Sequence, residues 1–327
     1  MKSELQHLEI TDFKTHSGVV YISIPLSYHV YGRELGTAPV VLVNHALTGN
    51  SEVTGRFGWW KELVGANKLI DTENYTVIAF NVPGNGYDNF LIESYKDFTA
   101  RDIAEIFALG LKQLNIDSLF AVIGGSVGGG IAWEMAALYP DLIENLIPVA
   151  SDWKSTDWLI ANCRIQEQIL LNSSNPVHDA RLHAMLCYRT PESFKEKFGR
   201  SLNSELNMYN VESWLLHHGK KLEERFELAS YKLLNQLLAT IDITKDGGSF
   251  LEVASRIKSN IYIVAVDSDL FFTAEENKAA FLALSQLKKN VYYSVIESVH
   301  GHDAFLIEFK QLSELLSDVF DTELIKN

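Results

Sequence analysis

The chain has 327 residues, of which 47% are hydrophobic and 21% are charged, as is typical of a soluble globular protein with a large core. A formal net charge of −14 argues against nucleic acid or an anionic membrane as a partner. No stretch approaches the roughly 20 apolar residues of a membrane span, and the N-terminus lacks the apolar run of a signal peptide. Two cysteines without metal-ligand spacing, Cys163 and Cys187, fit a reducing compartment, so we expect a cytoplasmic protein.

Along the chain, apolar runs typical of buried strands alternate with segments of helical periodicity. The first strand, Val19–Tyr31, alternates polar and apolar residues and is typical of an antiparallel hairpin. Strands that alternate with helices form a mostly parallel sheet flanked by helices, so we expect an α/β fold. The other predicted strands are Val40–Asn44, Tyr75–Phe80, Leu119–Ile123, Leu146–Ala150, Ile261–Val266 and Val291–Ile296, and the predicted helices are Ala100–Leu114, Ile131–Leu138, Glu275–Leu287 and Ile307–Phe320.

The alternation is interrupted between about Trp153 and Gly248, where helical patterns follow one another without strand signals. We interpret this segment as a helical lid inserted between two strands of the sheet. Such an insert covers the carboxyl ends of the strands, where open α/β sheets bind ligands. We therefore predict a core of residues 1–152 and 249–327 and a lid of residues 153–248. The predicted lid helices are Asp157–Leu171, Asp179–Tyr188, Pro191–Phe198, Val211–His218 and Leu222–Ile241.

The segment around Ser126 is the strongest functional signal. Its sequence, Gly124-Gly-Ser-Val-Gly128, is a G-x-S-x-G match between a predicted strand and a predicted helix. That context is required of a nucleophile elbow, in which a serine stands on a sharp turn and small neighbours let strand and helix approach. The helix that follows also directs its free N–H groups at the bond under attack. A glycine-rich turn with an inert surface serine is the alternative, and the flanking strand and helix favour the nucleophile.

A serine hydroxyl becomes a good nucleophile when a base takes its proton, and the base needs an orienting acid. In α/β-hydrolases the order along the chain is serine, acid, histidine, each after a later strand. Here Asp267 and Asp269 follow the last but one predicted strand, and His300 and His302 follow the last. Spacing leaves either aspartate as the acid and either histidine as the base. Two close histidines also suit a metal ion, but no third ligand has suitable spacing, so we expect no metal site.

Acyl transfer also needs two backbone N–H groups that form an oxyanion hole. One should belong to Val127, the residue after the nucleophile. The other should come from the loop after the strand Val40–Asn44, and we assign it to Leu47.

Several motifs from core and lid occur in order between about Val40 and Leu306. They are His45-Ala-Leu-Thr-Gly49, Arg56-Phe-Gly-Trp-Trp60, Gly124-Gly-Ser-Val-Gly-Gly129, Tyr188-Arg189, Ser268-Asp-Leu-Phe271 and Gly301-His-Asp-Ala-Phe-Leu306. Together they resemble the homoserine O-acetyltransferase family of the α/β-hydrolase superfamily. The resemblance implies an α/β-hydrolase fold and ping-pong transfer of an acetyl group from acetyl-CoA to the hydroxyl of L-homoserine, an early step toward methionine. It also implies acetyl-CoA as a co-substrate, no permanently bound cofactor, and a homodimer joined through the lids.

The resemblance assigns roles to individual residues. It makes Asp269 the acid and His302 the base, and it places Arg181, Tyr188 and Asp303 in substrate binding. The chemistry suits an amino-acid acceptor, since the planar fork of Arg181 can bind a carboxylate and Asp303 can bind an ammonium. Arg181 and Tyr188 are two helical turns apart and so share a face if their segment is helical.

The chain departs from the family after Asn81, where Asn81-Val-Pro-Gly-Asn-Gly-Tyr-Asp-Asn89 replaces a longer glycine-rich loop, and Val127 stands where methionine is more usual. The alternatives are therefore an esterase or thioesterase on the same residues, acyl transfer from succinyl-CoA or to serine, and a binding protein without activity.

Overall fold

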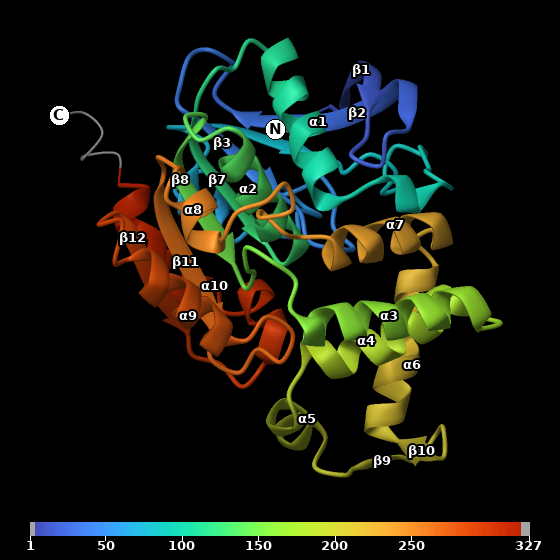
Figure 1. The fold of residues 1–327 in the computed structure, drawn as a ribbon. Helices are drawn as coiled ribbons and strands as arrows, with labels where there is room; N and C mark the ends of the chain where they lie inside the picture. The colour runs from blue at the N-terminus through green and yellow to red at the C-terminus, as the bar shows by residue number, and fades with distance from the viewer. Residues whose placement is uncertain (1–3, 322–327) are drawn as a thin grey trace.

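The computed structural model describes residues 4–321 and has an eight-stranded sheet at its centre (Figure 1). The first strand (Gln6–Lys14) pairs antiparallel with the second (Val20–Gly32), which in turn pairs antiparallel with β6 (Thr76–Phe80), and every following pair of neighbours is parallel. This arrangement confirms the predicted mostly parallel sheet. The strands lie in the order β1 (Gln6–Lys14), β2 (Val20–Gly32), β6 (Thr76–Phe80), β3 (Val40–Asn44), β7 (Leu119–Gly125), β8 (Ile143–Val149), β11 (Asn260–Val266) and β12 (Val291–Ile296).

The central strands are buried on both faces, which explains why they read as continuous apolar runs. In β3, Leu42 packs into the hydrophobic cluster on one face, while Val41 and Val43 pack into the cluster on the other. The first cluster contains residues of α1 (Ala100–Gln113), α2 (Val127–Leu138) and α9 (Ala274–Leu284). The second contains residues of α10 (Phe309–Leu316) and of the loop that follows β3. The sheet is therefore flanked by helices on both faces, as predicted.

The predicted core strands and helices are present, with ends that differ by a few residues. The largest gain is at α2, which begins at Val127 rather than Ile131, because its first turn consists mostly of glycines that carry no helical periodicity. The predicted final helix is α10 followed by the short 3-10 turn η3 (Ser317–Val319). Elements that the sequence pattern did not predict are β1 (Gln6–Lys14), β4 (Val64–Gly65), β5 (Ile70–Asp71), η1 (Tyr95–Asp97), α8 (Phe250–Ala254) and η2 (Gly301–Leu306).

Six helices lie between β8 and β11, and the first five of them lie together beside the sheet (Figure 1). The expectation that this segment lacks strands is wrong, because a short hairpin joins its third and fourth helices. The expectation of one helix over Leu222–Ile241 is also wrong, because the chain turns at Phe226, whose buried ring packs on Tyr231. The elements are α3 (Asp157–Asn172), α4 (Pro176–Tyr188), α5 (Pro191–Phe198), β9 (Leu202–Asn203), β10 (Met208–Tyr209), α6 (Asn210–Glu223) and α7 (Leu228–Ala239).

The two ends of this helical segment lie side by side. The Ile243 N–H donates to the Trp153 carbonyl at 3.2 Å, and the Ser155 N–H donates to the Ile241 carbonyl at 2.8 Å. Lys154 and Asp242 form an antiparallel β-bridge between them. The inserted segment therefore leaves the core and returns to it at one place.

Candidate active site

Ser126 stands on a strained turn between β7 and α2. Its φ of 58° and ψ of −127° are a backbone conformation that residues with a side chain rarely adopt. The turn is possible because its neighbours are glycines. A Cβ on Gly124 would lie 2.4 Å from the Gly128 carbonyl carbon, and one on Gly128 would lie 2.5 Å from the Asn44 carbonyl oxygen. This is the strand–turn–helix geometry expected of a nucleophile elbow.

The structure brings Ser126, His302 and Asp269 together from three separate parts of the chain. The Ser126 Oγ lies 2.9 Å from Nε2 of His302, and Nδ1 of the same ring lies 2.7 Å from Oδ2 of Asp269. All three residues are buried, with 3–4% of their surface exposed. A hydroxyl, an imidazole and a carboxylate in this sequence of hydrogen bonds can remove a proton from the serine and return it to a leaving group.

Backbone donors and aromatic rings fix the acid and the base. Oδ1 of Asp269 accepts hydrogen bonds from the N–H groups of Phe271, at 2.6 Å, and Phe272, at 3.0 Å. These donors leave Oδ2 facing the imidazole. The His302 ring packs against Phe271, Phe272 and Phe305, with ring centroids 5.1–5.8 Å apart. The imidazole is thus held in one orientation within an apolar shell.

The alternative acid and base lie elsewhere. Oδ1 of Asp267 accepts a hydrogen bond from the Ser298 N–H at 3.0 Å. Nδ1 of His300 lies 3.2 Å from an Arg189 guanidinium nitrogen and 3.2 Å from the Ser193 hydroxyl. Neither residue forms a hydrogen bond with Ser126, so the choice that spacing left open favours Asp269 and His302.

The N–H groups of Leu47 and Val127 have no hydrogen-bond partner among residues 4–321. Val127 opens α2, so its N–H is one of the free donors at the helix N-terminus. Leu47 lies on the loop after β3 and is 6% exposed. Two free N–H groups, one at the start of α2 and one on the loop after β3, are what an oxyanion hole requires.

The buried His45 braces the loop that carries Leu47, a role that sequence reasoning missed. Its Nδ1 lies 2.8 Å from the Ala46 carbonyl oxygen, and its Nε2 accepts the Val82 N–H at 3.0 Å. These contacts require the neutral tautomer with the proton on Nδ1. Burial lowers the pKa of His45 to about 4, which keeps the ring in that neutral form.

The loop after Asn81 supplies further support that the sequence pattern did not reveal. Oδ1 of Asn81 accepts the Ser51 N–H at 2.8 Å and the Asn85 side-chain amide at 3.1 Å. The Asn81 amide also donates to the Ser27 hydroxyl at 2.9 Å. The two asparagines therefore tie the loop after β6 to the loop after β3.

The three residues expected to bind substrate have different surroundings. The Arg181 guanidinium lies 5.6 Å from the centroid of the Tyr188 ring, which itself lies 5.4 Å from the His302 ring. Among residues 4–321, the Arg181 side chain forms no hydrogen bond or ion pair. Asp303 is already paired, since its Oδ2 accepts a hydrogen bond from Nε of Arg189 at 2.9 Å. Arg181 is thus a cation without a partner, whereas Asp303 has only Oδ1 left for a ligand.

The electrostatic setting of Tyr188 reflects these neighbours. Burial raises the pKa of the Tyr188 hydroxyl well above its usual range, nearby Asp303 raises it further, and the Arg181 cation opposes the rise. The phenol therefore stays neutral under the influence of a nearby cation and a nearby carboxylate.

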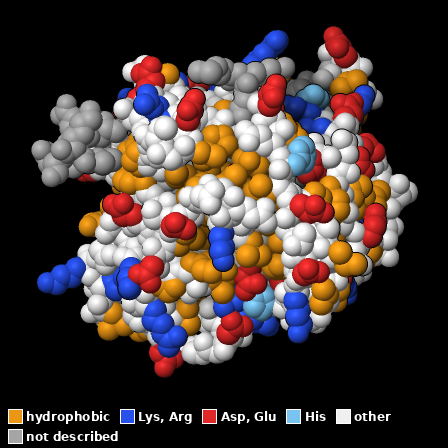
Figure 2. All heavy atoms as spheres, turned by 90° about the horizontal axis from the view of Figure 1, so that it is seen from above, with side chains coloured by type: hydrophobic (Ala, Val, Ile, Leu, Met, Phe, Trp, Pro, Cys, Tyr) orange, Lys and Arg blue, Asp and Glu red, His pale blue; other side chains and the backbone are white. Residues whose placement is uncertain are grey.

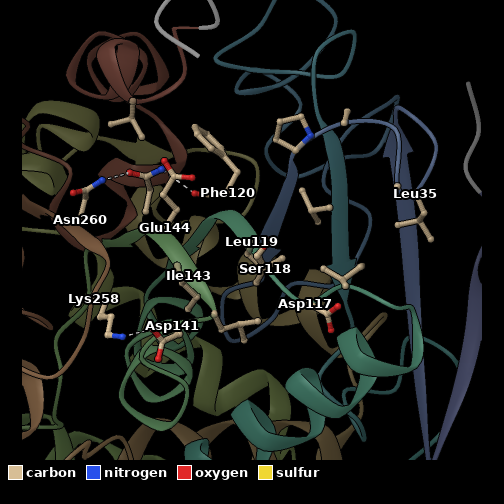
Figure 3. Close-up of a pocket in the computed structure, with 18 of the residues that line it drawn as sticks. Leu35, Asp117, Ser118, Leu119, Phe120, Asp141, Ile143, Glu144, Lys258 and Asn260 are labelled. Carbon is tan, nitrogen blue, oxygen red and sulfur yellow. Dashed lines mark hydrogen bonds and ion pairs between the residues drawn. The ribbon is translucent and has the colours of Figure 1, made fainter. Parts of the chain in front are cut away.

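A wide hollow lies at the end of the sheet opposite to Ser126, which follows the carboxyl end of β7. It has a volume of about 1340 Å³ and is lined by the residues that begin β7, β8 and β11 (Figure 3). Asp117, Glu144 and the ion pair of Lys258 with Asp141 lie around it. Figure 2 views the molecule from above, and acidic and basic side chains lie scattered among hydrophobic ones on that face. Ligands of parallel sheets bind at the opposite, carboxyl ends of the strands, so this hollow is not the candidate active site.

Three further observations concern metal sites, membrane spans and the two cysteines. Among residues 4–321, no group of three or more His, Cys, Asp and Glu side chains is arranged to hold a metal ion. No helix in the described part of the chain is long and apolar enough to cross a membrane. Cys163 and Cys187 are both free thiols.

Comparison with known proteins gives consistent results. A family model described as the alpha/beta hydrolase fold matches residues 39–308. A homoserine O-acetyltransferase of Trichormus variabilis is 31% identical over 345 aligned positions, which cover 96% of this chain and 93% of that protein. Esterase E22, at 20% identity, has a TM-score of 0.87 over 98% of this chain and 100% of its own. Homoserine O-acetyltransferase from Bacillus anthracis, also at 20% identity, has a TM-score of 0.85 over 98% of both chains.

Proposed function

We propose a specific reaction for this chain, which belongs to the alpha/beta hydrolase superfamily and within it to the homoserine O-acetyltransferase family. The reaction is transfer of an acetyl group from acetyl-CoA to the hydroxyl of L-homoserine, which yields O-acetylhomoserine and free coenzyme A for methionine biosynthesis. The observation that carries it is the hydrogen-bonded chain from Ser126 through His302 to Asp269, close to the unpaired cation of Arg181.

In the first step, Nε2 of His302 takes the proton of Ser126, and Oγ attacks the thioester carbonyl carbon. The N–H groups of Leu47 and Val127 stabilise the oxyanion that forms, and Asp269 stabilises the imidazolium. The carbon–sulfur bond then breaks, and the departing thiolate takes the proton from His302. The products of this step are coenzyme A and an acetyl ester of Ser126.

In the second step, homoserine binds with its carboxylate on Arg181 and its ammonium at Oδ1 of Asp303, while Tyr188 lies against the substrate between them. His302 takes the proton of the homoserine hydroxyl, whose oxygen attacks the acetyl carbonyl. The oxyanion collapses, the bond to Ser126 breaks, and Oγ recovers its proton from His302. The enzyme is regenerated without any permanently bound cofactor.

The main alternative is hydrolysis, because the same three residues can pass the acyl group to water. Arg181 favours an amino-acid acceptor, since a guanidinium without a counterion suits a carboxylate ligand. Three further alternatives are succinyl-CoA as the donor, serine as the acceptor, and a binding role without activity. The assays described next distinguish among them.

The test is an activity matrix in which purified protein receives acetyl-CoA or succinyl-CoA together with homoserine, serine or water. Thiol release is followed optically, and the products are identified by mass spectrometry. We expect O-acetylhomoserine as the main product and slow thiol release without acceptor. Equal thiol release with and without homoserine would indicate a hydrolase, and no release from either donor would indicate a binding protein.

The proposal also covers the extent of the lid, the oligomeric state and the cellular compartment. We assign residues 153–248 to a lid that excludes water from the acetyl-enzyme, and residues 1–152 and 249–327 to the core. Exposed apolar side chains on the lid, among them Leu186 at 55% and Leu202 at 67% exposure, support a homodimer joined through the lids. Two free thiols fit a cytoplasmic enzyme.

A further inference from the structure

A small enclosed cavity lies beneath the helices that follow β8, next to the candidate active site. Its volume is about 10 Å³, which is room for one water-sized group. Three of its lining residues reach the catalytic groups: Leu47 carries the proposed oxyanion donor, and the rings of Tyr188 and Phe271 lie 5.4 and 5.1 Å from the His302 ring. The cavity is therefore an extension of the candidate site into the lid.

Two buried polar atoms of residues that line this cavity have no hydrogen-bond partner. They are Oε1 of Gln166, a residue 8% exposed on α3, and the hydroxyl of Tyr231, a residue 1% exposed on α7. The Gln166 amide nitrogen donates to the Ala180 carbonyl at 3.2 Å and lies 3.0 Å from Nδ1 of His183, so Oε1 is the end left free. Buried polar atoms nearly always have a partner, so two orphans beside one cavity indicate a ligand.

The charge beside the cavity indicates which kind of ligand. The Arg181 guanidinium lies 5.6 Å from the centroid of the Tyr188 ring, which lines the cavity, and this cation counteracts the rise in the pKa of the Tyr231 hydroxyl that burial causes. An anion bound to Arg181 would therefore lie beside the cavity whose lining residues carry these two hydrogen-bond acceptors. A ligand for this place needs a carboxylate for Arg181 and N–H donors for the two acceptors. The α-ammonium and α-carboxylate of an amino acid meet both needs.

We propose that Oε1 of Gln166 and the hydroxyl of Tyr231 bind the ammonium group of the acceptor. This inference rests on the proposed function and extends its acceptor site. An ammonium group is about as large as a water molecule and has three N–H donors. Gln166 and Tyr231 accept two of them, which leaves the third for Oδ1 of Asp303. The two residues thereby select acceptors that carry an α-amino group.

The test compares homoserine with 4-hydroxybutanoate, which has the same hydroxyl and carboxylate but no amino group. In Tyr231→Phe, we expect kcat/KM for homoserine to fall about 10- to 100-fold, the usual effect of losing one hydrogen bond to a charged group. For 4-hydroxybutanoate, kcat/KM should stay within about twofold of the parent value. The burst of thiol that reports acetyl-enzyme formation should be unchanged.

Two further variants keep the test decisive. Gln166→Met, which has a similar volume and no amide, should reproduce the selective loss of homoserine. Tyr75→Phe is the matched control, because it removes another buried hydroxyl, one directed at the Phe320 carbonyl, and should leave both acceptors unaffected.

Equal losses for both acceptors in Tyr231→Phe and Gln166→Met would show a packing role and overturn this proposal while leaving the proposed function intact. If the parent protein releases thiol but never acetylates homoserine, the proposed function fails and this assignment fails with it.

Discussion

Replacing the carboxylate of Asp269 by an amide tests the hydrogen-bonded chain most directly. In Asp269→Asn, the side-chain oxygen should keep the position of Oδ1, where the N–H groups of Phe271 and Phe272 donate to it. The new amide nitrogen then faces Nδ1 of His302. Two donors cannot face each other, so the imidazole must move its proton to Nε2. In that tautomer Nε2 donates to Ser126 and cannot take its proton.

The structure bounds the size of the effect. The correct tautomer returns only if the amide flips, which turns its N–H group toward the two backbone N–H donors and leaves them without an acceptor. Each buried donor left without a partner costs about 1–3 kcal/mol. The two together cost about 2–6 kcal/mol, which corresponds to a loss of about 30- to 10⁴-fold in rate.

The assay is the burst of thiol from acetyl-CoA, because acylation of Ser126 is the first step that needs the base. Asp267→Asn is the matched control, since Asp267 follows the same strand and, among residues 4–321, its carboxylate accepts a hydrogen bond only from the Ser298 N–H. We expect the control to stay within about threefold of the parent, as is usual for a substitution away from the reacting groups. A burst rate in Asp269→Asn that falls less than tenfold would refute the tautomer argument, provided that circular dichroism shows an intact fold.

Three further predictions concern the turn, the nucleophile and a buried acid. Ser126→Ala should fold normally and lose labelling by a fluorophosphonate, as seen by intact mass; a label retained elsewhere would contradict the assignment. Gly128→Ala should lower the free energy of unfolding by about 1–3 kcal/mol, because the new Cβ would lie 2.5 Å from the Asn44 carbonyl oxygen; an unchanged denaturation midpoint would refute this. Burial raises the pKa of Asp152 from 3.8 to about 7, so the folded state binds a proton that the unfolded state releases, and stability falls as pH rises from about 4 to 8. Asp152→Asn should remove that loss, so its melting temperature relative to the parent should be higher at pH 8 than at pH 5; an equal difference at both values would refute the argument.

Much of the fold could be predicted from the sequence because its strands are buried on both faces. Val40–Asn44 and Val291–Ile296 have the bounds that their apolar runs predicted. The hairpin between Leu202 and Tyr209 was missed, because each of its strands has only two residues and is too short for a period to show. The long helix predicted over Leu222–Ile241 was wrong for a different reason. Its apolar residues keep a helical pattern on both sides of the turn, so the pattern does not reveal the turn that tertiary packing imposes.

The candidate site was predictable where local geometry defines it and not where distant residues meet. Ser126 could be predicted because its strand, glycines and helix are contiguous. The pair Asp267 and Asp269 could not be separated, because both follow the same strand and only the folded loop shows which one reaches the imidazole. The contact of Arg189 with Asp303 joins residues 114 positions apart, and no local pattern records it.

Because the ends of the segment between β8 and β11 lie side by side, we expect this part of the molecule to be an exchangeable module. Because Trp153 and Ile243 are already hydrogen-bonded neighbours, a short linker could close the gap if everything between them were removed or replaced. Chimaeras that carry another relative's helices on this platform would therefore leave the nucleophile, base and acid undisturbed while changing which molecule receives the acyl group. Among related enzymes, a new acceptor specificity can arise from changes in the inserted segment, without changes to the catalytic residues of the core.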